Sequence, residues 1–215
     1  MTNMILYDYF RSSAAFRVRI ALNLKNISAE HRFVHLAKNE QCQPEYRALN
    51  PQGLVPMLVD SAFYLTQSLA IIEYLNDLYP EPPLLPADPA ERAFARSIAQ
   101  LVACDMHPLN NKRVLDYLTS ELQVSEIQKN QWYAHWIQEG FAAIESLLAA
   151  RNLKGAFCAG DQPGMADVCL IPQVFNARRF NCPLEDFPRL MQVYRYCMQL
   201  PAFDNAQPSK QPDAE

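Results

Sequence analysis

The sequence predicts an α/β domain followed by an all-helical domain. Hydrophobic spacing alternates between strand and helix periods over the first 80 residues and is helical throughout after residue 90. A proline-rich stretch separates the two regions. With 215 residues, half of them hydrophobic, the chain has enough apolar side chains for one domain or two small ones.

The first region has the expected order strand, helix, strand, connecting segment, strand, strand, helix. Short β-rich runs mark the strands, and apolar residues at helical spacing mark the helices. The strand–helix–strand unit implies a parallel pair, and a hairpin around Asp60 and Ser61 adds an antiparallel edge. The expected strands are 4–7, 31–36, 55–59 and 63–65, and the expected helices carry Phe16, Ile20 and Leu24, and Ile71, Leu75 and Leu78.

The domain boundary falls in Tyr79–Pro89, which holds five prolines in eleven residues. Proline removes a backbone donor and restricts φ, so this stretch is expected to be a stiff linker. We therefore assign residues 1–81 to the α/β domain, 82–90 to the linker and 91–215 to the helical domain.

The sequence of the second region predicts long helices and a frayed C-terminal tail. Pro108 disfavours the helical conformation at His107, so a kink is expected there. Asp167, three residues after Gly164, suits the first turn of a helix, and the polar tail Gln207–Glu215 is expected to be frayed. The expected helices are 92–118, 125–148 and 165–180, of which the last is apolar enough to be central.

Composition excludes several classes of function. The chain has 19 basic and 23 acidic residues, a formal charge of −4, which argues against a nucleic-acid partner. No apolar run approaches a membrane span, and the N-terminus does not resemble a signal peptide. Six cysteines without a CxxC pair indicate reduced thiols in a cytoplasmic protein, and neither zinc-like spacing nor a phosphate loop occurs.

The Arg11-Ser12-Ser13 segment joins the first strand to the first helix. A serine there can simply cap the helix by accepting amide hydrogens. A helix N-terminus after a strand also attracts an anion, and a serine hydroxyl can donate to a thiolate and lower its pKa. Arg11 adds positive charge, and both interpretations stay open.

Two later segments also admit two interpretations. Val55-Pro56 is either a trans pair that opens a strand or a cis bond that turns the Val55 backbone toward a peptide-like ligand. Gln67-Ser68 opens a helix, where Ser68 is either an N-cap or part of a site for a carboxylate.

Polar groups cluster at two places in the helical region. Asp105–Arg113 sets His107, Asn111 and Arg113 around a proline inside an expected helix, and such broken local rules are often functional. Arg178 and Arg179 are either a solvated helix end or a carboxylate clamp.

Five stretches carry a family resemblance that covers most of the chain in family order. They are YFRSSAAFRVRIALNLK (9–25), ALNPQGLVPML (48–58), QSLAIIEYLNDLYP (67–80), DMHPLNNKRVLDYL (105–118) and GDQPGMADVCLIPQVFNARRF (160–180). The chain resembles the cytosolic glutathione transferases of the zeta class, and most closely the bacterial maleylacetoacetate isomerases.

The resemblance implies a thioredoxin-like domain, an all-helical domain, a homodimer and glutathione as cofactor. It implies a cis bond at Pro56, pairing of the Val55 backbone with the cysteinyl part of glutathione, and a γ-glutamyl carboxylate held by Gln67 and Ser68. It also implies that Ser12 activates the thiol, with Ser13 beside it. His107, Asn111 and Arg113 match positions near glutathione and substrate. Arg179 matches the arginine that binds a substrate carboxylate, with Arg178 as its neighbour, and Arg11 is a candidate for the other carboxylate.

The sequence departs from the resemblance at two positions. Many zeta-class enzymes have Ser-Ser-Cys at the serine turn, where this chain has Ser12-Ser13-Ala14, so no protein thiol is expected to act there. Gly164 replaces the usual hydroxyl cap, at a cost of a few tenths of a kcal/mol.

The implied activity is cis–trans isomerisation of maleylacetoacetate, a small dicarboxylic diketo acid, in tyrosine and phenylalanine catabolism. The alternatives are a maleylpyruvate isomerase, a general zeta-class transferase, and a non-catalytic glutathione-transferase-like module that binds a protein. Retention of Ser12, Val55-Pro56 and Gln67-Ser68 argues against the last.

Overall fold

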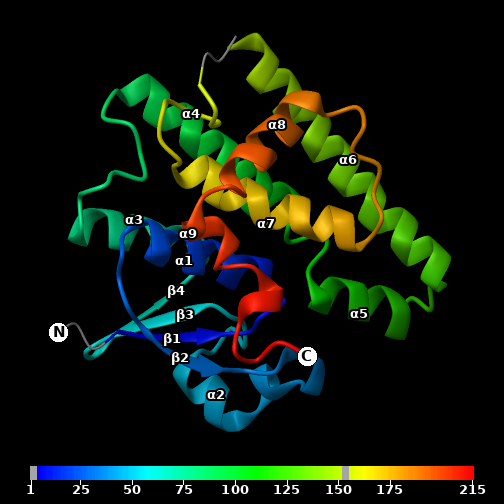
Figure 1. The fold of residues 1–215 in the computed structure, drawn as a ribbon. Helices are drawn as coiled ribbons and strands as arrows, with labels where there is room; N and C mark the ends of the chain where they lie inside the picture. The colour runs from blue at the N-terminus through cyan, green and yellow to red at the C-terminus, as the bar shows by residue number, and fades with distance from the viewer. Residues whose placement is uncertain (1–3, 152–154) are drawn as a thin grey trace. The chain divides into compact units, whose positions relative to one another are not determined.

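The structure is a computed structural model that describes residues 4–151 and 155–215 (Figure 1). The chain divides into two compact units. The first contains the residues up to Leu84 together with Met198–Glu215, and the second spans Leu85–Cys197.

The first unit is built on a four-stranded mixed sheet with the strand order β2-β1-β3-β4. β1 pairs with β2 in parallel, and the β1–β3 and β3–β4 pairs are antiparallel, which confirms the predicted crossover and hairpin. The elements are β1 (Met4–Asp8), α1 (Ser13–Leu24), β2 (Glu30–Phe33), η1 (Leu36–Lys38), η2 (Glu40–Cys42), α2 (Pro44–Leu49), β3 (Met57–Asp60), β4 (Phe63–Thr66), α3 (Ser68–Leu78), α9 (Pro201–Asp204) and η4 (Pro208–Lys210).

Two strands are shorter than predicted. β2 ends at Phe33 because its partner β1 ends at Asp8, the residue paired with Phe33. β3 begins at Met57 rather than Val55, since Pro56 has no amide hydrogen to give to a ladder.

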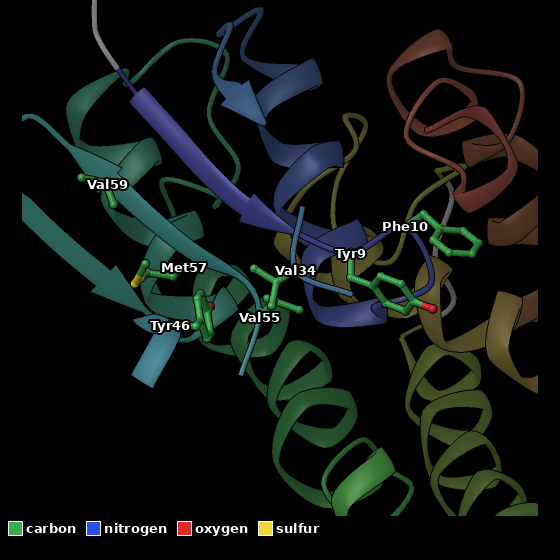
Figure 2. Close-up of a cluster of buried hydrophobic side chains, with 7 residues drawn as sticks. All are labelled: Tyr9, Phe10, Val34, Tyr46, Val55, Met57 and Val59. Carbon is green, nitrogen blue, oxygen red and sulfur yellow. The ribbon is translucent and has the colours of Figure 1, made fainter. Parts of the chain in front are cut away.

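The two faces of the sheet carry different helices. In the first unit α1 and α3 lie on one face and α2 on the other (Figure 1). Buried and partly buried residues alternate along β1, so Leu6 and Asp8 share the face of α1, where Asp8 bonds to Arg19. A second cluster includes Tyr46 of α2 with Met57 and Val59 (Figure 2).

The C-terminal segment corrects one prediction. The tail Gln207–Glu215 was expected to be frayed, but it contains η4 and its side chains bond to the first unit, as at Phe10 and His35. Residues 198–215 therefore group with the first unit rather than with the helices that precede them. As a division into independently folding domains, the expected bounds stay a prediction.

The second unit is helical throughout. Its elements are α4 (Pro89–Gln100), η3 (Leu101–Met106), α5 (Lys112–Ser120), α6 (Glu126–Ala150), α7 (Met165–Arg179) and α8 (Pro188–Cys197). α7 packs against α4 and α8, and twelve of its residues are buried, as its apolar sequence predicts. The predicted role of Asp167 is confirmed, because its carboxylate accepts the amide hydrogens of Gly164 and Cys158.

The expected helix 92–118 is wrong. α4 passes into the π-helical turn η3, and a new helix, α5, starts after a five-residue break. Pro108 has no amide hydrogen to continue the helix, and Asn111 caps α5 by accepting the amide hydrogen of Arg113. His107 itself keeps helical angles, φ −59° and ψ −41°, so the chain breaks after it rather than kinking at it.

Candidate active site

The sheet register brings the predicted residues of the first unit to one end of the sheet. Tyr7 at the carboxyl end of β1 pairs with Met57 at the start of β3, and Met57 pairs with Thr66 at the end of β4. The β1–α1 turn with Ser12, the Val55–Pro56 bond before β3, and the Gln67-Ser68 start of α3 therefore meet at this end. Segments as far apart in sequence as Ser12 and Ser68 therefore lie at the same end of the sheet.

Ser12 lies in a tight turn and caps α1. Its amide donates to the Tyr9 carbonyl at 2.9 Å, and its Oγ accepts the amide hydrogen of Ala15 at 3.2 Å. The capping prediction is therefore confirmed. A hydroxyl that accepts in this way still has its own hydrogen to donate, so capping and thiol activation are compatible. Ser13 is the buried first residue of α1.

The Val55–Pro56 bond is cis, as the resemblance implies. The preceding residue, Leu54, is anchored by its carbonyl, which accepts from the Tyr46 hydroxyl at 2.6 Å and from Asn50 Nδ2 at 2.7 Å. Burial raises the pKa of Tyr46 to about 12, so Tyr46 keeps the hydrogen that it donates to Leu54. These two hydrogen bonds fix the segment that leads into the Val55–Pro56 bond.

The start of α3 differs from the prediction in detail. Ser68 is the first helical residue, not the cap, and Gln67 precedes it with a positive φ of 71°. A non-glycine residue at positive φ is strained, and such strain is often found at functional sites. Gln67 Nε2 donates to Gln52 Oε1 at 3.0 Å.

Arg17 is a residue that sequence reasoning missed. It is 1% exposed, and its Nη1 donates to Ser68 Oγ at 3.1 Å. A guanidinium can only donate, so Ser68 accepts from Arg17 and directs its own hydrogen elsewhere. The signal in the sequence is the spacing of Arg17 and Arg19 in an expected helix. Residues two apart lie on nearly opposite sides of a helix, so the two arginines cannot both be on its solvent side when the helix packs against a sheet.

Arg11 is exposed and bonded to its own turn. Its Nη2 and Nε donate to the Tyr9 hydroxyl at 2.9 Å and 3.3 Å, and its guanidinium lies 4.8 Å from the centre of the Phe10 ring. The cation is thus held beside Ser12 by aromatic side chains.

In the second unit, the predicted residues around Pro108 have unequal roles. Asn111 is the cap of α5, Arg113 is exposed, and His107 is partly buried at the end of η3. Two hydrogen bonds attach segment 107–111, the break between η3 and α5, to α6. Trp132 Nε1 donates to the Leu109 carbonyl at 2.9 Å, and Asn110 Nδ2 donates to the Tyr133 carbonyl at 3.1 Å.

Arg178 and Arg179 end α7, and both are exposed. Arg178 Nη1 donates to the Tyr194 hydroxyl at 3.3 Å, and its guanidinium lies over the Tyr194 ring. The Arg179 guanidinium lies 4.8 Å from the Phe180 ring, which stacks on Tyr133. Burial raises the pKa of Tyr133, and the charge of Arg179 opposes the increase.

The cysteines are poor nucleophiles where they are buried. Burial raises the pKa of Cys158, Cys182 and Cys197. Only Cys42 and Cys104 are exposed, and neither is in the β1–α1 turn.

Comparisons with known proteins decide the family. The N-terminal domain model of glutathione S-transferase matches residues 2–77, and the C-terminal domain model matches residues 130–195. The chain belongs to the glutathione S-transferase family. A Vibrio cholerae protein named "Probable maleylacetoacetate isomerase" is 48% identical over the whole of both chains. The maleylpyruvate isomerase of a Ralstonia species is 46% identical over 98% of this chain and 100% of that one.

Solved structures place this family member in the zeta class. A maleylpyruvate isomerase described as a bacterial zeta-class glutathione S-transferase has a TM-score of 0.96 and 45% identity, covering 98% of this chain and 100% of that one. The maleylacetoacetate isomerase of Methylobacterium extorquens, solved with malonate and glutathione, has a TM-score of 0.95 and 39% identity, with 98% and 99% coverage. The predicted fold class, a thioredoxin-like domain with an all-helical domain, is confirmed.

Proposed function

We propose that this protein is a glutathione-dependent cis–trans isomerase of maleylacetoacetate, active in tyrosine and phenylalanine catabolism. The observation that carries the proposal is the register of the sheet. It gathers a helix-capping serine, a cis-proline loop and a second helix start at one end of the sheet.

This end of the sheet fits glutathione chemically. Ser68 Oγ, backed by the guanidinium of Arg17, and the start of α3 suit a carboxylate. The anchored Val55 backbone suits pairing with a peptide, and Ser12 with the start of α1 suits a thiolate. When bound, glutathione supplies a thiolate that adds reversibly to the cis alkene, so that the bond becomes single and can rotate.

The protein's own residues activate the thiol and hold the substrate. Ser12 donates its hydroxyl hydrogen and lowers the pKa of the thiol, with Ser13 as its neighbour. His107 and Arg11 stabilise negative charge that develops on the substrate, and Asn111 and Arg113 contribute polar contacts. Arg179 binds a substrate carboxylate as a fork, with Arg178 beside it and Arg11 as candidate for the other carboxylate.

The proposal also covers the oligomeric state, cellular compartment and partners of the enzyme. We infer a homodimer in the cytoplasm, with no nucleic-acid or membrane partner. Within the described residues, no helix is long and apolar enough to cross a membrane.

Maleylpyruvate is the second candidate substrate, and it is shorter with the same reacting group. It is favoured by the high structural similarity to a maleylpyruvate isomerase. Comparing kcat/KM on the two acids separates these candidates, and higher kcat/KM on maleylpyruvate would reverse the assignment.

Two variants test the roles of Ser12 and Arg179. Ser12→Ala is expected to lower glutathione-dependent turnover by more than about tenfold, and unchanged turnover removes Ser12 from the mechanism.

Arg179→Ala is expected to raise KM for the diketo acid, whereas Arg195→Ala, at an exposed arginine on α8, serves as the matched control. An unchanged KM in Arg179→Ala would refute the clamp. Failure to bind glutathione below millimolar concentration in calorimetry would favour the non-catalytic alternative.

A further inference from the structure

The C-terminal segment Met198–Glu215, here called the C-terminal strap, bonds to the elements that present Ser12. Four of its contacts reach α1, the β1–α1 turn and the segment after β2. Asn23 Nδ2 donates to the Ala202 carbonyl at 2.9 Å, Arg19 Nε donates to the Ala206 carbonyl at 3.0 Å, the Phe10 amide donates to Asp213 Oδ2 at 3.0 Å, and His35 Nε2 lies 2.7 Å from Glu215 Oε1.

Phe10 is the point at which the C-terminal strap meets the serine turn. The turn is closed by the bond from the Ser12 amide to the Tyr9 carbonyl, so Phe10 is its second residue. The Phe10 amide donates to Asp213, and the Phe10 carbonyl accepts from Arg19 Nη2 at 3.0 Å. Both backbone polar groups of Phe10 are therefore held by side chains, and the residue as a whole is 5% exposed. Its side chain belongs to the buried cluster drawn in Figure 2.

Arg19 links the same elements from the other side. Its Nη1 donates to Asp8 Oδ1 at 2.7 Å in a pair that is almost fully buried. The same guanidinium reaches Phe10 in the turn and Ala206 in the C-terminal strap. Arg19 Nη1 also lies 3.5 Å from the Tyr9 carbonyl oxygen, so the planar fork has four acceptors and holds these groups in one arrangement.

Asp213 occupies its position at an energetic cost. Its Oδ1 is buried and accepts no hydrogen bond from the residues that the structure describes. The charge of Arg19 attracts this carboxylate and offsets part of the cost of burying an oxygen without a donor. A polar residue kept at such a cost is often needed for function. Among the residues that the structure describes, the Asp213 side chain accepts its hydrogen bond from the turn that ends in Ser12.

We propose that Asp213 is a positioning residue for Ser12, fixing the turn through the Phe10 amide so that the Ser12 hydroxyl is presented for thiol activation. This inference rests on the proposed function, because it assumes that Ser12 activates the thiol of glutathione. It assigns to the C-terminal strap a part in the site more than two hundred residues from the serine.

The test compares Asp213→Ala with Asp213→Asn. Alanine removes the acceptor, whereas asparagine keeps an oxygen acceptor without the charge. The pKa of the bound glutathione thiol is measured in the binary complex from thiolate absorbance against pH, and exchange of the Phe10 amide hydrogen is followed by NMR. Neither readout requires turnover.

Asp213→Ala is expected to raise the thiol pKa by about one unit and to accelerate exchange at Phe10 by more than about tenfold. In Asp213→Asn, the thiol pKa and the exchange rate at Phe10 are both expected to stay close to the values of the unsubstituted protein. If the negative charge were responsible instead, asparagine would behave like alanine, and the proposal would be overturned. Unchanged exchange at Phe10 in the alanine variant would also overturn it.

Two reference variants separate this inference from the proposed function. Lys210→Met breaks an exposed pair with Asp204 in the same C-terminal strap and is expected to change neither readout. Ser12→Ala should raise the thiol pKa by at least as much as Asp213→Ala. If Ser12→Ala raises the thiol pKa and Asp213→Ala does not, only the inference fails. If neither raises it, the role of Ser12 fails and the inference fails with it.

Discussion

Ser12 accepts one hydrogen bond and has one hydrogen to give. The acceptor role caps α1 through the Ala15 amide, and the donor role is the proposed catalytic one. Because one side chain combines a structural and a chemical role, an alanine substitution alone cannot separate them. An acidic cap can, since it accepts but does not donate.

Ser12→Asp is expected to separate stability from activity. Aspartate caps a helix as well as serine does, so the free energy of unfolding should stay within about 0.5 kcal/mol, whereas Ser12→Ala should lose about 1 kcal/mol. Both variants should lose more than about tenfold in kcat, because neither donates to the thiolate and the aspartate charge opposes it. Urea denaturation and steady-state kinetics measure the two quantities. An active Ser12→Asp enzyme would contradict the donor role.

Arg17 is expected to set the affinity for glutathione through Ser68. Arg17→Lys keeps a cation but lacks the planar fork, so calorimetry should show a Kd for glutathione raised by about tenfold. The matched control is Arg32→Met, an exposed arginine on β2 that pairs with Glu30, and its Kd should not change. Equal affinities in the two variants would remove Arg17 from the site.

Burial predicts which thiols react. Cys42 and Cys104 are exposed, and the other four of the six cysteines are buried. Labelling of the native protein with a thiol reagent should therefore modify two cysteines rapidly and the others only after unfolding. Mass spectrometry identifies the modified residues, and rapid labelling of Cys158 or Cys197 would contradict the described packing.

At this scale, sequence reasoning finds residues that act locally. The cap at Ser12 and the acid at Asp167 follow from their positions before a helix or in its first turn. The bonds from Arg17 to Ser68 and from Phe10 to Asp213 join residues 51 and 203 positions apart. No local pattern predicts such pairs.

At the scale of elements, η3 is held against α6 by a close approach at Gly140. A Cβ atom at Gly140 would lie 2.0 Å from the Met106 sulfur, and Met106 is 1% exposed. The absence of a side chain therefore lets the turn that carries His107 pack on α6. The proline at position 108 predicts an irregularity there, but not the partner helix.

Gly140→Ala is expected to destabilise the protein by about 1–3 kcal/mol, although alanine favours a helix. The cause is the clash with Met106, so the double variant Gly140→Ala/Met106→Ala should show a favourable coupling energy. Urea denaturation of the four proteins in the cycle measures it. Additive losses would mean that the cost of Gly140→Ala does not come from the clash with Met106.

The C-terminal strap is expected to loosen in acid. A hydrogen bond from His35, which lies outside the C-terminal strap, lowers the pKa of Glu215. A carboxyl group with a lowered pKa in the folded state stabilises it above the ordinary carboxyl pKa, and this contribution is lost as the pH falls through the folded value. Hydrogen exchange in residues 198–215 should therefore accelerate relative to β1 as the pH falls below about 4. Equal acceleration in β1 would indicate global unfolding instead.

The frayed-tail prediction was wrong for a physical reason. Polar and proline-rich composition indicates a segment without an apolar core of its own. Residues 207–215 are instead held by their surroundings, because Phe203 and Ala206 just before them are buried and Asp213 accepts a hydrogen bond from the Phe10 amide. Composition cannot reveal partners of this kind.

At the scale of the whole molecule, hydrophobic period predicts the order of elements and their class. It identifies the strand–helix–strand unit and the hairpin, which the strand pairing confirms. Hydrophobic period does not predict which residues pair across strands. The pairing of Tyr7 with Met57, which brings the three site segments to one end of the sheet, is known only from the structure. The site was therefore proposed from family resemblance rather than derived from periodicity.

The central claim is that glutathione is regenerated while the double bond changes geometry. The most direct measurement follows maleylacetoacetate and free thiol together, with and without glutathione. We expect conversion to the trans acid only with glutathione present, many turnovers per glutathione, and a constant thiol concentration. Conversion at full rate without glutathione, or one thiol consumed per substrate, would contradict the claim.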